Sequence, residues 1–177
     1  MNFKMTKLGL AIAAIATAGA AFAANDDATF EVSASIASQC VVGNTTNMGF
    51  GALTMLDTTT GGRSTAKNNA TATFDATCTN GTVAPTLKFA SANGGGSAFK
   101  MMGGTGTDLI TYTLYEGSAD SGTLIAHNSL AAFTGFDADG AVKSLSVTGK
   151  VLAADKDGKP IGAYSDTVTI TVGFTAD

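Results

Sequence analysis

The strict alternation of apolar and polar residues is the feature that most constrains how this chain can fold. Between residues 28 and 36 every second residue is apolar, and the residues between them are Thr, Glu or Ser. The apolar set is Ala28, Phe30, Val32, Ala34 and Ile36. A period of two places successive side chains on opposite faces of an extended strand. The segment is therefore predicted to be a strand with one dry face and one wet face.

The same period recurs along the rest of the chain, which predicts an all-β fold. Further strands are expected at residues 70–78, 109–115, 145–151 and 168–174. Tight turns are expected at Asn80-Gly81, Asp139-Gly140 and Asp157-Gly158, because Asn, Asp and Gly tolerate positive φ. No segment after residue 24 keeps a helical apolar period over ten or more residues. Several strands at this spacing are typical of a single sandwich or barrel domain.

Two segments lack a clear strand pattern. Residues 56–69 are predicted to be a loop. Residues 91–107 are dense in Gly and Ser around Met101 and Met102, and a mobile surface loop is expected there, with a buried edge as the alternative.

The first 23 residues have the pattern of a secretory signal. Lys4 and Lys7 precede an apolar run from Leu8 to about Ala20, and the small-residue site Ala21-Phe22-Ala23 follows. The run is shorter than the roughly 20 residues that a bilayer requires. We expect cleavage after Ala23, export of residues 24–177 as one domain, and no membrane insertion.

Charge and cysteine content narrow the class of protein further. Without Lys4 and Lys7, 8 basic residues face 14 acidic ones, so the exported chain has a net charge of −6. An acidic chain with scattered lysines argues against nucleic acid and against an anionic membrane surface. Cys40 and Cys78 are expected to form a disulfide after export. Closing their loop contributes about 3–4 kcal/mol in the chain-entropy model.

The usual motifs of catalysis and cofactor binding are missing from the sequence. His127 is the single histidine and no Gly-x-Ser-x-Gly elbow is present, so His127 is interpreted as an ordinary surface residue. Residues 137–140 and 155–158 each resemble half of a calcium loop but lack its other ligands, and both are interpreted as turns. Two thiols and one distant histidine do not make a metal site. We expect no enzymatic activity, no metal and no cofactor.

Five short motifs together carry a resemblance to a known family. They are the alternating strand that runs into Cys40, Asn47-Met48-Gly49-Phe50-Gly51, Cys78-Thr79-Asn80-Gly81-Thr82, residues 109–115 (Leu-Ile-Thr-Tyr-Thr-Leu-Tyr) and residues 162–168 (Gly-Ala-Tyr-Ser-Asp-Thr-Val). In this order and spacing they resemble the spore coat protein U domain family, the pilin subunits of archaic, Csu-type chaperone–usher pili.

The resemblance implies an immunoglobulin-like Greek-key β-sandwich that lacks its last strand. A periplasmic chaperone, and then the N-terminal strand of a neighbouring pilin, would fill the open groove, and an outer-membrane usher would export the fibre to the cell surface for adhesion and biofilm formation. It divides the exported chain into a donor segment (24–37) and a sandwich domain (38–177). Donor residues would be Ala28, Phe30, Val32, Ala34 and Ile36, and the groove edge would be Val168, Ile170, Val172 and Phe174.

Two other functions stay open at the level of the sequence. The first is a self-complete secreted β-sandwich that binds carbohydrate or another surface ligand, with residues 25–36 pairing inside their own domain. The second is a secreted hydrolase, against which the missing motifs argue.

Overall fold

The computed structural model describes residues 28–104 and 106–175. The predicted signal peptide, residues 1–23, and the first part of the predicted donor segment, residues 24–27, lie outside the described residues. Of the described residues, those from 35 onward form one compact unit, and residues 28–34 belong to a separate one.

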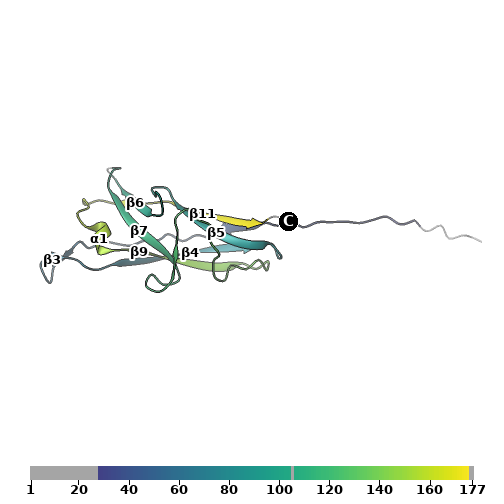
Figure 1. Cartoon of the computed structure of the whole chain (residues 1–177), viewed down its shortest axis with the longest axis horizontal. Helices are drawn as coiled ribbons and strands as arrows, with labels where there is room; N and C mark the ends of the chain where they lie inside the picture. Colours follow the sequence, from purple (N-terminus) through teal and green to yellow (C-terminus); the bar gives the residue numbers. More distant parts are fainter. Residues whose placement is uncertain (1–27, 105, 176–177) are drawn as a thin grey trace, which may run out of the picture. The chain divides into compact units, whose positions relative to one another are not determined.

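The larger layer of the compact unit is an antiparallel sheet of seven strands (Figure 1). Its path is β1 (Cys40–Gly43), β4 (Asn68–Cys78), β9 (Lys143–Val151), β7 (Leu109–Glu116), β6 (Phe99–Gly103) and β10 (Tyr164–Ser165), and β8 (Thr123–Ile125) also pairs with β7. All four strands predicted after residue 69 are present. Those at 70–78, 109–115 and 145–151 correspond to β4, β7 and β9, and the one at 168–174 lies in the second layer.

The second layer consists of β5 (Val83–Ser91) and β11 (Val168–Thr175), which are antiparallel neighbours. The other edge of β5 is occupied, since Leu87 and Ala131 exchange two backbone hydrogen bonds there. A two-stranded ribbon of β2 (Leu56–Asp57) and β3 (Gly62–Arg63) and one helical turn, α1 (Ala153–Lys156), complete the described elements.

The core lies between the two layers, and the alternation explains which residues fill it. In β4 the side chains of Phe74, Ala76 and Cys78 are buried, while Thr71 and Thr73 between the apolar positions are exposed. The ring of Phe74 meets Phe89 of β5 edge-on across the layers, with centroids 5.8 Å apart. Such edge-to-face pairs stabilise a core beyond the area that they bury. The expected all-β sandwich is confirmed, and its arrangement is consistent with the immunoglobulin-like type, whereas the lack of a last strand stays a prediction.

The disulfide between Cys40 and Cys78 is present. The two residues are direct partners in the β1–β4 register, with Cα atoms 4.1 Å apart. A four-residue turn, 79–82, then leads from Cys78 into β5, whose Val83 lies opposite Thr175 of β11. The start of β1 and the end of β11 therefore lie at the same end of the domain, which we call the disulfide end.

Two predictions about loops were wrong. The segment 91–107 contains β6, and Phe99 and Met101 of that strand are buried in the core. This strand is buried because it pairs with β7 and contacts β5 of the second layer. The glycines with positive φ, Gly96 and Gly106, lie in the turns on either side of it. The segment 56–69 contains β2, β3 and the first residues of β4.

Candidate functional site

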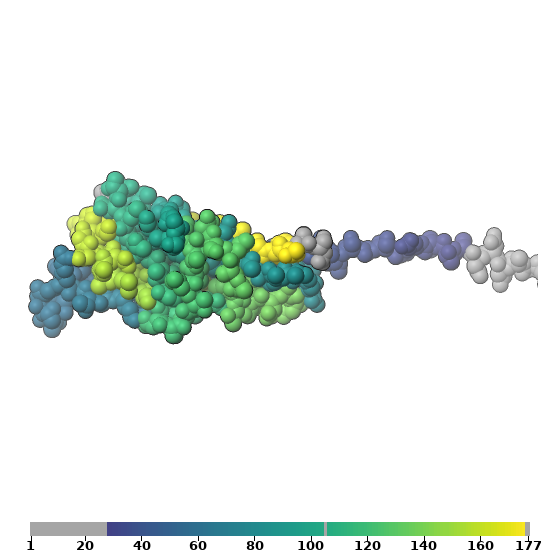
Figure 2. Space-filling model, viewed as in Figure 1, coloured from purple at the N-terminus to yellow at the C-terminus, as the bar shows by residue number. Residues whose placement is uncertain are grey.

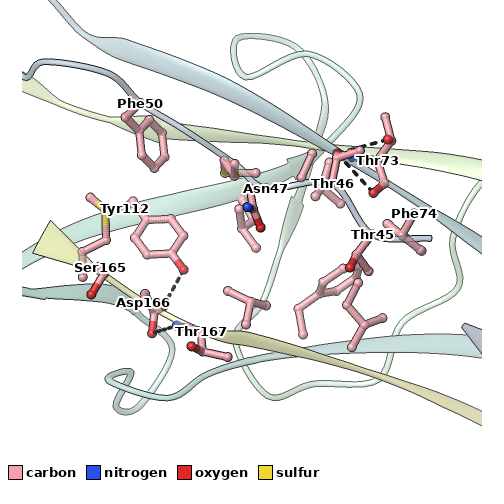
Figure 3. A pocket seen from close by; sticks show the side chains of 18 of the residues that line it. Thr45, Thr46, Asn47, Phe50, Thr73, Phe74, Tyr112, Ser165, Asp166 and Thr167 are labelled. Atoms are coloured by element: carbon pink, nitrogen blue, oxygen red, sulfur yellow. Dashed lines mark hydrogen bonds between the residues drawn. The ribbon is translucent and has the colours of Figure 1, made fainter. Parts of the chain in front are cut away.

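A cavity of about 480 Å³ opens beside β11, between the two layers of the sandwich (Figure 3). One wall is the segment 45–50, which follows β1, and the other is the segment 164–170, which leads through β10 into β11. Core residues form its floor: Phe74, Phe89, Met101, Leu114 and Val147. We call this cavity the β11 groove. It reaches the hydrophobic core from one edge of the domain.

The edge of β11 that borders the groove has no strand partner among residues 28–104 and 106–175. The amide of Ala92 donates to the carbonyl oxygen of Thr167 at 2.9 Å, which fixes the hydrogen-bonding phase of the β5–β11 ladder. Because antiparallel partners alternate, the backbone groups of Thr169 and Thr171 point toward β5 and those of Val168 and Ile170 point away from it. A row of backbone donors and acceptors is therefore available for a further strand.

The wall opposite β11 is held in place by contacts with β4 and β9. The amide of Thr46 donates to the carbonyl oxygen of Thr73 at 2.8 Å, and the amide of Thr73 donates to Thr46 Oγ1 at 2.7 Å. Met48 and Phe50 lie directly over Gly149, where an added Cβ would come within 2.4 Å of the sulfur and 2.7 Å of the ring. Because Gly149 has no side chain, Met48 and Phe50 of this wall can pack directly on β9.

A hydrogen-bond network forms the end of the groove at the start of β11. The hydroxyl of Tyr112 donates to Asp166 Oδ2 at 2.6 Å, and Asp166 Oδ1 accepts from the amide of Thr167 at 2.8 Å (Figure 3). Asp166 Oδ1 also accepts from the amide of Asn93 at 3.3 Å. Burial raises the pKa of the Tyr112 phenol well above its ordinary value, and the bond to the Asp166 carboxylate raises this pKa further. We call this the polar end of the groove.

Toward the disulfide end, the lining of the cavity stops at Ile170 on β11. β1 lies against β11 there, and Val172 packs on the core. Of the four residues predicted for the groove edge, Val168 and Ile170 line the cavity. Phe174 lies at a register shift between β11 and β5 and is 38% exposed. The groove is therefore open along the first half of β11.

The predicted donor residues are exposed. Phe30, Val32 and Ile36 have 87%, 82% and 87% of their surface accessible, and Ala28 and Ala34 are exposed as well. No strand is assigned to residues 28–36. Large apolar side chains in such a row are unusual on a folded surface, because each loses the free energy that burial would provide.

His127 is more integrated than the sequence suggested. Its ring lies within hydrogen-bond distance of the carbonyl oxygens of Gly96 (3.1 Å) and Ser91 (3.5 Å) and meets Phe99 edge-on. The side chain thus fastens the loop before β6 to β5, rather than lying free on the surface. It does not line the groove.

The described residues contain no group of three or more His, Cys, Asp or Glu side chains that could hold a metal ion. Within the same ranges, no helix has the length and apolar character needed to cross a membrane.

Several groove residues were missed by reasoning from sequence alone. The floor residues Phe74, Leu114 and Val147 look like any inward residue of a strand, so nothing local marks them as lining a cavity. The polar end had a signal, because Asp166 falls within the motif at residues 162–168. Its partner Tyr112, however, is 54 residues away in sequence.

Comparison with known proteins adds the family to this geometry. The Spore Coat Protein U domain matches residues 26–171. The chain belongs to the spore coat protein U domain family. Two of the motifs quoted above line the groove. Met48 and Phe50 of the motif at 47–51 belong to one wall, and Tyr164 and Asp166 of the motif at 162–168 belong to the other.

Among solved structures, one similar chain comes from work entitled "Chaperone-tip adhesin complex is vital for synergistic activation of CFA/I fimbriae biogenesis". The identity is 14% and the TM-score 0.42, and the match covers 62% of this chain and 35% of that one. This chain therefore spans about a third of the length of that one. No curated protein matches the sequence.

Proposed function

We propose that this protein is a non-enzymatic structural subunit of a surface pilus, assembled by the chaperone–usher route through donor-strand exchange. Residues 28–36 of one subunit fill the β11 groove of the next. In transit through the periplasm a chaperone covers the groove, and an outer-membrane usher exports the growing fibre, which serves adhesion and biofilm formation. The observation that carries the proposal is an open apolar groove beside an unpaired strand edge. The same chain has an exposed row of apolar residues at 28–36, ahead of its first strand.

The dimensions of the two parts agree. The nine residues 28–36 would extend about 30 Å as a strand, and the eight residues of β11 extend about 26 Å. Pairing with β11 would satisfy its free backbone groups, as in other cases of strand addition. The alternate side chains would then point into the core of the acceptor.

The free energy available is large enough for a durable contact. Phe30, Val32 and Ile36 are nearly fully exposed, and burial of each contributes about 1.5–3 kcal/mol. Because β1 lies against the second half of β11, a strand of full length has to move β1 aside near Val172. We therefore expect insertion to begin in the open half of the groove, near Val168 and Ile170.

The donor segment and the groove are different surfaces, so the contact between copies is heterologous. Such a contact leaves one donor and one groove free after every addition, and it produces a filament rather than a closed dimer.

The proposal is tested by SDS gel electrophoresis without boiling, after co-expression of the exported chain with a chaperone of this pilus class. We expect a ladder of heat-sensitive multimers from the full chain and none after deletion of residues 25–37. Phe30→Asp and Val32→Asp should abolish the ladder, whereas Thr29→Asp and Ser33→Asp, on the other face of the same strand, should retain it.

Monomers alone from the full chain under these conditions, as from the deletion variant, would refute the proposal. That outcome would favour the self-complete module, with the groove as its ligand site.

A further inference from the structure

The positions of the two ends of the domain determine how neighbouring subunits would meet. This inference rests on the proposed function. The donor segment leads into β1 at the disulfide end, where β11 also ends. A donor strand parallel to β11 would finish at the acceptor's disulfide end, where the acceptor's own donor segment starts. Two disulfide ends would then face each other, and such a contact cannot be repeated from copy to copy to build a fibre. A donor antiparallel to β11 finishes at the polar end, so that the disulfide end of one copy faces the polar end of the next.

The chain between the donor strand and its own domain is too short to keep the two domains apart. Gln39 is already fixed to the turn that follows β4, because its amide donates to Thr79 Oγ1 at 3.1 Å and its carbonyl oxygen accepts from the Thr79 amide at 2.8 Å. Between Ile36 and Gln39 only Ala37 and Ser38 remain. Three fully extended residues span at most about 11 Å. The disulfide end of the donor subunit must therefore lie against whatever surrounds the polar end of the acceptor.

A loop with an exposed apolar side chain stands at that place. Residues 157–163 connect α1 to β10, and Ile161 within them is fully exposed. The loop is anchored to the groove, because the hydroxyl of Tyr164, which lines the cavity, donates to the carbonyl oxygen of Pro160 at 3.0 Å. An ion pair between Asp157 and Arg63 of β3 holds its first residue. Ile161 is thus presented beside the polar end on a fixed support.

The disulfide end offers apolar surface of its own. Val41, Val83 and Val142 are 65%, 51% and 65% exposed. Val41 lies directly opposite Thr77 of β4, next to the disulfide, and Val83 begins β5 after the 79–82 turn. In Figure 2 the region of residues 150–163 (yellow-green) and the end of β11 (yellow) lie at opposite ends of the domain.

We propose that the 157–163 loop, with Ile161 at its centre, is a second docking surface between subunits, and that its occupant is the disulfide end of the next copy in the fibre. Donor-strand insertion fixes which subunits are neighbours. The loop contact then sets the angle between their domains and limits bending of the fibre.

Hydrogen–deuterium exchange separates the loop contact from groove filling. We expect a variant without residues 24–36 to keep every strand of the compact unit, because the first one begins at Cys40, so that a synthetic peptide of residues 25–37 can fill its groove. In fibres of the full chain, we expect exchange in residues 157–163 to be at least about tenfold slower than in the peptide-filled variant, because only the fibre brings a second domain. Equal exchange in the two samples would overturn the inference.

Substitution of Ile161 provides the second arm, with Leu124 on β8 as a matched exposed residue away from both ends. Ile161→Asp should leave the affinity for the peptide within about twofold and should accelerate exchange in the loop of the fibre about tenfold, and Leu124→Asp should change neither. Unchanged loop exchange in Ile161→Asp fibres would also contradict the inference. Absence of peptide binding to every variant would instead count against the proposed function itself.

Discussion

Strands β4 and β11 have the same alternating sequence pattern but different surroundings. β4 pairs with β1 on one edge and with β9 on the other, and the side chains of Phe74 and Cys78 are 1% and 0% exposed. β11 pairs only with β5 within the described residues, and Val168 and Ile170 remain half-buried beside a cavity. The pattern thus determines which face of a strand is apolar, whereas the number of neighbouring strands determines whether that face is sealed.

The largest effect is expected from truncation of a fully buried side chain of β4. Phe74→Ala should lower the free energy of unfolding by about 3–5 kcal/mol, because it leaves a cavity among Phe89 and Phe133. Ile170→Ala should cost only about 1 kcal/mol in the empty domain, since this side chain already borders open space. Urea unfolding of the oxidised variant without residues 24–36, whose groove is empty, measures both. Equal losses at the two positions would contradict the difference in burial between β4 and β11.

Removal of the disulfide is expected to have the next largest effect. The double variant Cys40→Ala/Cys78→Ala should lose about 3–4 kcal/mol, because the bond closes a loop with a sequence separation of 38. The loss should be the same with and without a peptide of residues 25–37, as the bond joins β1 to β4 and does not line the groove. Urea unfolding with and without the peptide measures both losses. A loss of stability that occurs only with the peptide bound would contradict this prediction.

An added methyl group on β9 sharpens the comparison at the groove wall. Gly149→Ala should cost about 1–3 kcal/mol, because the new carbon collides with Met48 and Phe50 and pushes this wall toward β11. The control is Gly43→Ala in β1, where nothing lies within 4 Å and the expected change is within about 0.5 kcal/mol. Binding of the peptide, measured by calorimetry, should weaken for Gly149→Ala only. Unaltered binding would mean that the wall does not shape the groove.

The smallest effect concerns pH. Since the pKa of Tyr112 is raised in the folded state, the folded protein favours the protonated phenol, and this contribution is complete below a pH of about 10, the ordinary tyrosine value. It is lost as the pH rises toward the raised pKa. Thermal unfolding should therefore show a steeper fall in stability above this pH than Tyr112→Phe does. Identical pH profiles would place the Tyr112 hydroxyl in water rather than at a buried polar end.

The sequence predicted what depends on local pattern and missed what depends on distant partners. The strands at 70–78 and 145–151 and the Cys40–Cys78 bridge were predictable, since alternation and export bear on them directly. β5 was missed because Pro85 interrupts it, and β6 because glycines surround its buried Phe99.

The groove was only half predictable for the same reason. Val168 and Ile170 follow from the last alternating run. The polar end joins Tyr112 of β7 to Asp166 in the link between β10 and β11, and only the fold brings these two residues together.

The central claim, that β11 has a free edge which a strand of a second copy covers, is tested most directly by amide exchange at residue resolution. In the empty domain, nuclear magnetic resonance should find fast exchange for the amides of Val168 and Ile170 and slow exchange for those of Thr169 and Thr171, which point toward β5. Addition of the peptide of residues 25–37 should slow Val168 and Ile170 by orders of magnitude and leave the two threonines unchanged. Slow exchange at all four amides before the peptide is added, or fast exchange at Val168 and Ile170 after it, would contradict the account.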